Sequence, residues 1–181
     1  MRKVMGAAVA VLGIFVGTQT ASADDLSIKA FSGLWEGNAV SYSNNSAEFP
    51  ITSRDLDVEI KPASDSRFEI TWRTLLRQKG SPDKPKSELK ETKRIYEKEA
   101  GDKVWRQQPA GSGFDGQPLS WVTLKDQTLT LYSMAVRDDG GYDMLIYART
   151  LTGLNMKLDF KALRNGEVRR TAGGTLIKTA N

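Results

Sequence analysis

The sequence predicts an all-β fold, a single closed antiparallel up-and-down β-barrel of about ten strands. Apolar and polar residues alternate along most of the chain, which is typical of strands with one buried and one solvent-facing side. Short turn signals separate the alternating runs, so consecutive strands are expected to pair as hairpins. A meander of this length would leave two unpaired edges in an open sheet, and closing the barrel pairs both. A two-sheet sandwich is the alternative, but its crossovers need longer connections than most of those here.

The alternation places each expected strand and its inner face. Segment 88–98 is rich in lysine and glutamate, but Thr92, Ile95 and Tyr96 favour a strand over a helix. Asn165-Gly166 is the preferred pair of a tight hairpin turn. The expected strands are 32–43, 54–62, 67–77, 88–98, 102–108, 119–125, 127–137, 142–151, 154–164 and 167–178. The side chains expected to point inward include Leu56, Val58, Ile60, Phe68, Ile70, Trp72, Leu154, Met156, Leu158 and Phe160.

The first residues form a pattern separate from the barrel. A basic start, an uncharged apolar run over 4–16 and the small residues Ala21-Ser22-Ala23 are typical of a secretory signal peptide. The apolar run is shorter than the roughly 20 residues of a membrane-spanning helix. We therefore expect cleavage after Ala23, a barrel domain over 24–181 without a transmembrane segment, and a periplasmic or secreted location.

Composition narrows the chemistry. The chain has 26 basic and 22 acidic residues, and cleavage would remove two basic ones, a balance that does not indicate a nucleic-acid-binding protein. It has no cysteine and no histidine, so disulfides, the commonest metal ligand and the usual general base are absent. We expect no metal, no cofactor and no enzymatic activity. A hydrolase would have to use paired carboxylates, and the acidic residues fall on the outward-facing positions.

A tryptophan between two glycines opens the first strand, in the stretch Gly33-Leu34-Trp35-Glu36-Gly37. The triplet resembles the Gly-x-Trp motif of the lipocalins and the wider calycin superfamily. The resemblance implies that Trp35 closes one end of the barrel beneath a basic residue of the last strand. Arg170 has the matching parity and is the expected partner. Gly33 and Gly37 would let the strand bend and another backbone approach the indole.

The resemblance implies non-covalent binding of a small hydrophobic or amphipathic molecule inside the barrel. No histidine is present for the haem of nitrobindins, and no typical lipocalin Thr-Asp-Tyr motif is found. The alternative is a packed barrel that acts as a protein-interaction module of the cell envelope. The candidate ligand-binding residues are Trp72, Arg106, Phe114, Tyr132, Tyr147 and Arg149.

Three other features complete the expectations. Segment 107–118 is a glycine- and proline-rich connection that could form a rim loop, with Phe114 as an apolar lid. Segment 78–94 is strongly basic, which suits either a solvated hairpin tip or transient contact with an anionic membrane surface. The strands around Tyr132 and Tyr147 are apolar on both faces, which suits either ordinary variation or a second buried surface such as a homodimer contact.

Overall fold

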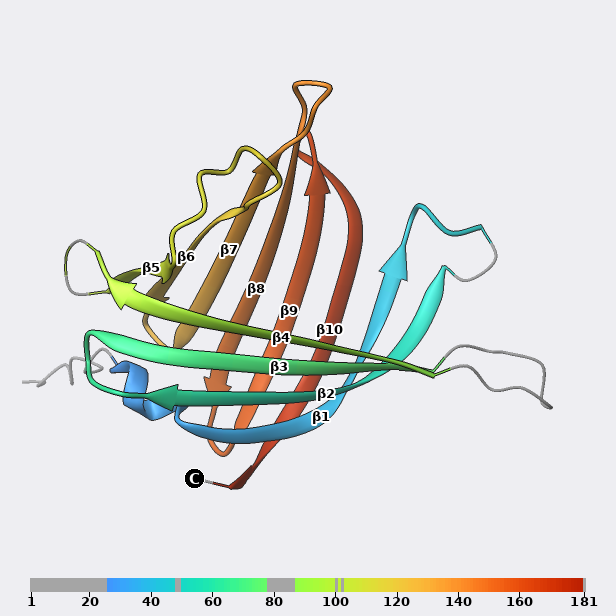
Figure 1. Cartoon of the computed structure of the whole chain (residues 1–181). Helices are drawn as coiled ribbons and strands as arrows, with labels where there is room; N and C mark the ends of the chain where they lie inside the picture. The colour runs from blue at the N-terminus through green and yellow to red at the C-terminus, as the bar shows by residue number, and fades with distance from the viewer. Residues whose placement is uncertain (1–25, 48–49, 78–86, 100, 102, 181) are drawn as a thin grey trace, which may run out of the picture.

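Ten antiparallel strands close into a barrel in the computed structural model, which describes residues 26–47, 50–77, 87–99, 101 and 103–180 (Figure 1). Each strand pairs with its neighbours in sequence, and the first pairs with the last, so the predicted fold is confirmed. The expected signal peptide lies outside the described residues. The strands are β1 (Gly33–Ser43), β2 (Ile51–Pro62), β3 (Arg67–Arg77), β4 (Ser87–Lys98), β5 (Val104–Gln108), β6 (Leu119–Lys125), β7 (Thr128–Val136), β8 (Tyr142–Thr152), β9 (Asn155–Arg164) and β10 (Glu167–Ala180).

Most strand boundaries agree with the sequence prediction. The lysine- and glutamate-rich segment is strand β4, and Asn165 and Gly166 both have positive φ in the β9–β10 hairpin, as its tight turn requires. Leu154 is a correction, because its side chain is 84 % exposed and does not point inward. Gly153 and Leu154 form the turn between β8 and β9, so the inward alternation starts only at Met156.

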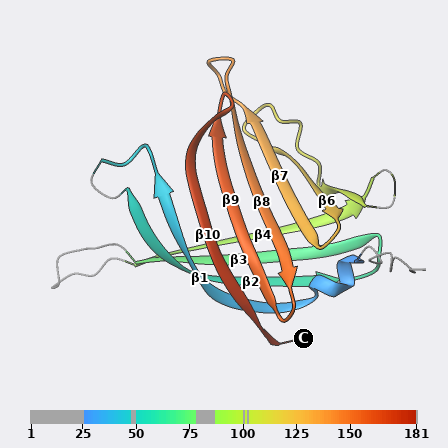
Figure 2. The same cartoon turned by 180° about the vertical axis from the view of Figure 1, so that it is seen from behind.

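The barrel is made of two groups of strands that cross at a steep angle. Strands β1 to β4 run across the molecule, whereas β7 to β10 run along it, and both views show the crossing (Figures 1 and 2). Strong twist and tilt of this kind accompany closure of a sheet into a barrel. The two ends of the barrel differ. We call the end that contains Trp35 the closed end, and the opposite end, where Ser43 of β1 faces Arg170 of β10, the open end.

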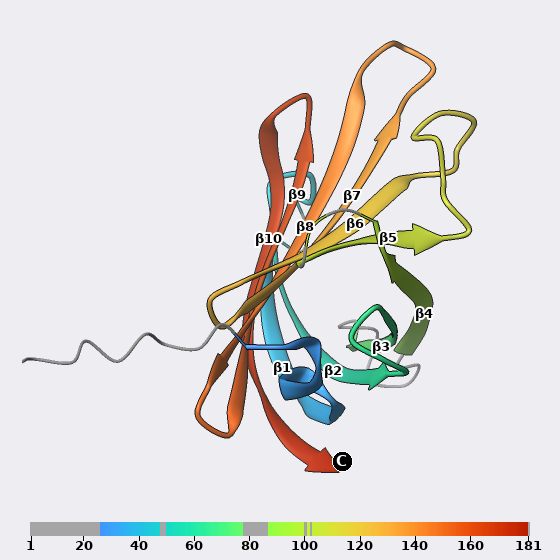
Figure 3. The same cartoon turned by 90° about the vertical axis from the view of Figure 1, so that its left-hand side faces the viewer.

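The closed end is filled by Trp35 and by the short 3-10 helix η1 (Ile28–Phe31). Trp35 is 2 % exposed, and its Nε1 donates a hydrogen bond to the carbonyl oxygen of Phe31 at 3.0 Å. Ile28 and Phe31 are buried in the same core, so η1 lies beside the start of β1 and covers this end (Figure 3). Trp35 is therefore buried beneath η1 at the end of the barrel where β1 begins.

The glycines around Trp35 allow β1 and β10 to approach closely. Gly33 has φ of +119°, and a Cβ there would meet the Ala180 carbonyl oxygen. A Cβ at Gly37 would meet the carbonyl oxygen of Thr175. Larger residues at these two positions would push β10 away from the indole of Trp35. This explains why the tryptophan has a glycine two residues away on each side.

The basic partner of Trp35 is Lys178, which corrects the prediction of Arg170. The Nζ atom of Lys178 lies 5.7 Å from the Trp35 ring centroid, whereas Arg170 lies over the ring of Phe160 at 5.3 Å. In an antiparallel pair the start of β1 meets the end of β10, so Arg170 faces Ser43 at the other end of β1. The parity of Arg170 was predicted correctly, but its level along the barrel was not.

Candidate ligand-binding site

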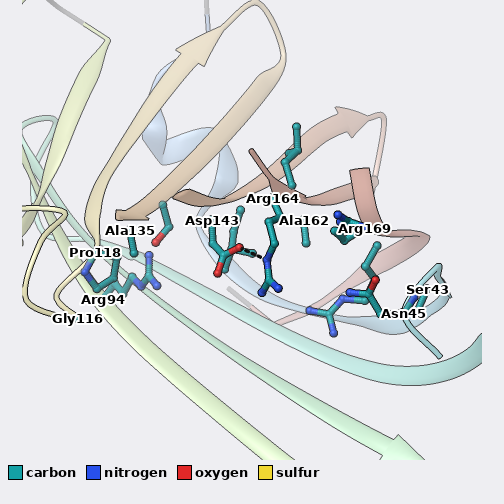
Figure 4. Close-up of a pocket in the computed structure, with 14 residues that line it drawn as sticks. Ser43, Asn45, Arg94, Gly116, Pro118, Ala135, Asp143, Ala162, Arg164 and Arg169 are labelled. Carbon is teal, nitrogen blue, oxygen red and sulfur yellow. Dashed lines mark hydrogen bonds and ion pairs between the residues drawn. The ribbon is translucent and has the colours of Figure 1, made fainter. Parts of the chain in front are cut away.

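The open end contains two cavities. The outer cavity has a volume of about 480 Å³ and lies between the 113–118 loop, β7, β8, β9 and β10. Figure 4 shows Arg94, Gly116 and Pro118 on one side of it, Ser43, Asn45 and Arg169 on the other, and Asp143 with Arg164 between. The inner cavity has a volume of about 90 Å³ and is enclosed by β1, β2, β3, β8, β9 and β10. Arg170 lines both cavities.

Arg149 is the most unusual residue of the inner cavity. It is placed on the inner face of β8 by its register with Leu129 and Leu158, and it is 1 % exposed. Its guanidinium carbon lies 5.7 Å from the ring centroid of Trp72 and 5.6 Å from that of Tyr147. Among the described residues, its Nε and Nη1 atoms have no hydrogen-bond partner. Aromatic faces and apolar strands therefore surround a cation whose hydrogen-bonding capacity is largely unused.

Burial determines the electrostatics of this cavity. It lowers the pKa of Arg149 to about 10, and the positive charge of Arg94 acts in the same direction. Burial also lowers the pKa of Arg54, with a further contribution from Arg170. Burial raises the pKa of Tyr147, so its phenol is neutral at neutral pH. Arg149 remains charged at neutral pH, and the inner cavity is strongly electropositive.

Arg94 is held beside Trp72 by a buried polar network. Its Nη1 donates to Ser120 Oγ at 2.9 Å, and its guanidinium carbon lies 5.4 Å from the Trp72 ring centroid. Ser120 Oγ donates to the carbonyl oxygen of Tyr132 at 2.8 Å, so Tyr96 must donate its hydroxyl proton to Ser120, 2.9 Å away. The network uses only part of the Arg94 guanidinium, which also reaches the outer cavity.

The cavities carry an excess of positive charge. Of the described residues that line them, six are arginine and only Asp143 is acidic. Asp143 accepts a hydrogen bond from Arg164 at 2.9 Å, so its charge is already paired. Arg169 forms an ion pair with Glu167 at 2.8 Å. Arg54, Arg149 and Arg170 each have a buried Nε without a hydrogen-bond partner in the described part of the chain.

Three of the six predicted ligand-binding residues lie together at the inner cavity. Trp72, Tyr147 and Arg149 line it, and Trp72 lies on the inner face that the parity of its strand predicted. Arg106 is on the outside of β5, where it forms an ion pair with Glu99 at 3.2 Å. It points outward because the side chain of the preceding residue, Trp105, is buried inside the barrel.

The other two predicted residues also lie away from the cavities. Phe114 is 59 % exposed in the loop before β6. Tyr132 stacks on Trp121 across the outside of β6 and β7, with the ring centroids 5.0 Å apart. It pairs there with the half-buried Ile146, so the apolar outer face that the sequence predicted is present, and the two rings partly cover it.

The sequence prediction missed Arg54, Arg94 and Arg170 as residues of the site. Each could have been found from strand parity, because Arg54 shares the face of Leu56, and Arg94 shares the face of Tyr96. Treating arginine as solvent-facing by default concealed them, since long charged side chains are seldom buried without a partner.

The arrangement is suited to binding an oxyanion. Guanidinium groups match the planar geometry of a carboxylate, and the surrounding apolar walls strengthen each charge-assisted hydrogen bond.

The described residues include no group of three or more metal-ligating side chains of the His, Cys, Asp or Glu type. In the same part of the chain, no helix has the length and apolar character needed to cross a membrane.

Comparisons with known proteins show the fold. The crystal structure of Rv2717c from M. tuberculosis matches with a TM-score of 0.50 and 12% sequence identity, covering 84% of this chain and 96% of that one. The S-type phycobiliprotein lyase CPES from Guillardia theta matches with a TM-score of 0.39 at 10% identity, covering 86% and 94%. No protein-family model matches the chain, and no curated protein matches it. The chain is thus a closed, ten-stranded antiparallel barrel similar in fold to Rv2717c.

Proposed function

We propose that the protein binds a small amphipathic molecule non-covalently in the open end of its barrel and acts in the periplasm or outside the cell. The observation that carries this proposal is the unfilled volume at the open end of the barrel. The outer cavity of about 480 Å³ is within the usual range of small-molecule sites. It combines apolar walls, such as Leu145 and Ala162, with several arginines. The same cavity argues against the alternative of a completely packed barrel.

The calycin resemblance and the signal-peptide pattern support this proposal. Barrels of this size can retain a cavity for one small ligand, and the fold is shared with Rv2717c. The pattern ending at Ala23 supports export. Fractionation of cells that express the full chain, with mass determination of the product, tests export. A product that begins at Asp24 outside the cytoplasm is expected, and an uncleaved cytoplasmic product would contradict it.

Native mass spectrometry tests ligand binding directly. The protein is purified without detergent and measured before and after addition of dodecanoic acid and of dodecanol. Displacement of a co-purified molecule or a one-to-one adduct is expected. Trp72 lines the inner cavity, so binding should change tryptophan fluorescence in the wild type and much less in Trp72→Phe. Failure of both amphiphiles to bind, with no co-purified molecule, would contradict the proposed function.

A further inference from the structure

We propose that Arg149 is an anion subsite that holds the carboxylate of an acidic amphiphile, with the head group inside the barrel and the apolar chain directed toward the open end. This inference rests on the proposed function, because it names the class of ligand and its orientation in the same site. It commits to a carboxylic acid with an apolar chain, as opposed to a neutral lipid.

The first argument is the unpaired state of Arg149. Removing one partner from a buried ion pair is strongly unfavourable, and an isolated buried cation is therefore rarely retained. Arg149 is 1 % exposed, with two guanidinium nitrogens that have no hydrogen-bond partner. None of the described residues that line the inner cavity is acidic. The missing counter-charge is best supplied by the ligand.

The second argument is the arrangement of the neighbouring cations. Arg54 and Arg170 line the same cavity, each with a buried unpaired Nε. They come from β2 and β10, whereas Arg149 comes from β8, so three separate strands direct a cation toward this cavity. Mutually repelling cations that converge on one space favour an anion within it, because an anion reduces their repulsion and accepts their hydrogen bonds.

The third argument is the size and shape of the two cavities. The inner cavity, at about 90 Å³, suits a head group and not a whole amphiphile. The closed end beyond it is filled with buried core, so an apolar chain cannot extend in that direction. The outer cavity offers Ala135, Leu145 and Ala162 along the way to the open end. The head group must therefore enter first.

A pair of ligands that differ only in the head group tests the carboxylate preference. Wild-type protein should bind dodecanoic acid at least about tenfold more tightly than dodecanol, by calorimetry at neutral pH. Arg149→Met should lose most of that preference while keeping its affinity for dodecanol. Arg73→Met is the matched control, because Arg73 lies on the outside of β3 and pairs with Glu91 at 2.6 Å. It should keep the preference.

The outcomes separate this inference from the proposed function. Equal binding of the acid and the alcohol by the wild type would overturn the carboxylate subsite and leave the proposed function standing. Failure of both to bind would overturn the proposed function itself. Retention of the full preference by Arg149→Met would show that another residue holds the anion, and would also overturn the inference.

Fluorescence quenching tests the orientation of the ligand. Bromine quenches nearby tryptophan, and Trp72 contacts Arg149 directly. Dodecanoic acid brominated beside the carboxyl group should quench Trp72 more than the acid brominated at the far end of its chain. Trp72→Phe supplies the background from the other tryptophans. Stronger quenching by the far-end bromine would place the chain inside and overturn the proposed orientation.

Discussion

The two ends of the barrel use the same contact, a cation over a tryptophan, in opposite ways. At the closed end, half-buried Lys178 lies over Trp35, whose Nε1 also finds a backbone acceptor. At the open end, fully buried Arg149 lies over Trp72 with nitrogens that lack a partner. A cation that reaches solvent can stabilise an aromatic core at little cost, whereas one that is buried creates a demand for an anion. The closed end is therefore a structural element, and the open end is the candidate site.

Substitution of Trp35 should cause the largest loss of stability, because it removes the packing of the closed end. Trp35→Ala leaves a cavity beneath η1 and removes the hydrogen bond to Phe31, so the free energy of unfolding should fall by about 3–5 kcal/mol. Urea denaturation measures the change. Trp121→Ala is the control, because Trp121 is half-buried on the outside of the barrel, and it should cost clearly less. Similar losses of unfolding free energy in Trp35→Ala and Trp121→Ala would contradict a special structural role of Trp35 at the closed end.

Substitution of Arg149, at the open end, should stabilise the ligand-free protein, in contrast to substitution of Trp35. Arg149→Met replaces a buried unpaired charge by an apolar side chain and should raise the free energy of unfolding of the ligand-free protein by about 1–4 kcal/mol. A stabilising substitution that also weakens acid binding is the signature of a residue retained for function. A loss of stability in the ligand-free protein would indicate a structural role.

The stabilities of the wild type and Arg149→Met should depend differently on pH. The pKa of Arg149 is lowered to about 10 in the folded state, so the unfolded chain binds the proton more strongly above that pH. The stability of the wild type should therefore rise relative to Arg149→Met as the pH increases through about 10. Tyr147, Tyr96 and Arg94 also act on the pKa of Arg149, so the stabilities of the wild type and the variant are compared at each pH. A gap that is constant from pH 8 to pH 11 would contradict a buried charge at Arg149.

Two adjacent glycines of β10 test the close approach of β1 and β10. A Cβ at Gly174 would meet the Asn38 carbonyl oxygen and Ala39. A Cβ at Gly173 has its nearest contact at 3.9 Å. Gly174→Ala should destabilise the protein by about 1–3 kcal/mol through overpacking. Gly173→Ala should be neutral or stabilise it by up to about 1 kcal/mol. Thermal unfolding of both variants checks the expectation, and equal effects would contradict it.

The smallest effect concerns the partner of Trp35. Lys178→Met should lower the free energy of unfolding by about 0.5–1 kcal/mol and change the emission of Trp35. Arg170→Met should leave that emission unchanged, because Arg170 lies over Phe160. The comparison is made in a Trp72→Phe background to remove the signal from the site. A change in Trp35 emission caused by Arg170→Met would restore the original sequence prediction.

Alternation of residues by itself determined the fold and most of the strand boundaries. The Gly-x-Trp resemblance, and not alternation, assigned Trp35 to a barrel end, and the side-chain types of Tyr147 and Arg149 suggested them as ligand contacts. Alternation also placed Trp72 on the inner face. These properties depend on the two-residue period of a strand, which any single strand carries. Arg106 and Tyr132 were misplaced because their side-chain types were given more weight than their parity.

Only the tertiary structure decided the level of each residue along the barrel. Lys178 and not Arg170 covers Trp35 because the register of β1 against β10 places the end of one strand at the start of the other. Convergence of Arg54, Arg94, Arg149 and Arg170 depends in the same way on the closure and tilt of strands that are far apart in sequence. Period alone says which face a side chain occupies, and the register of neighbouring strands decides which other side chains it meets.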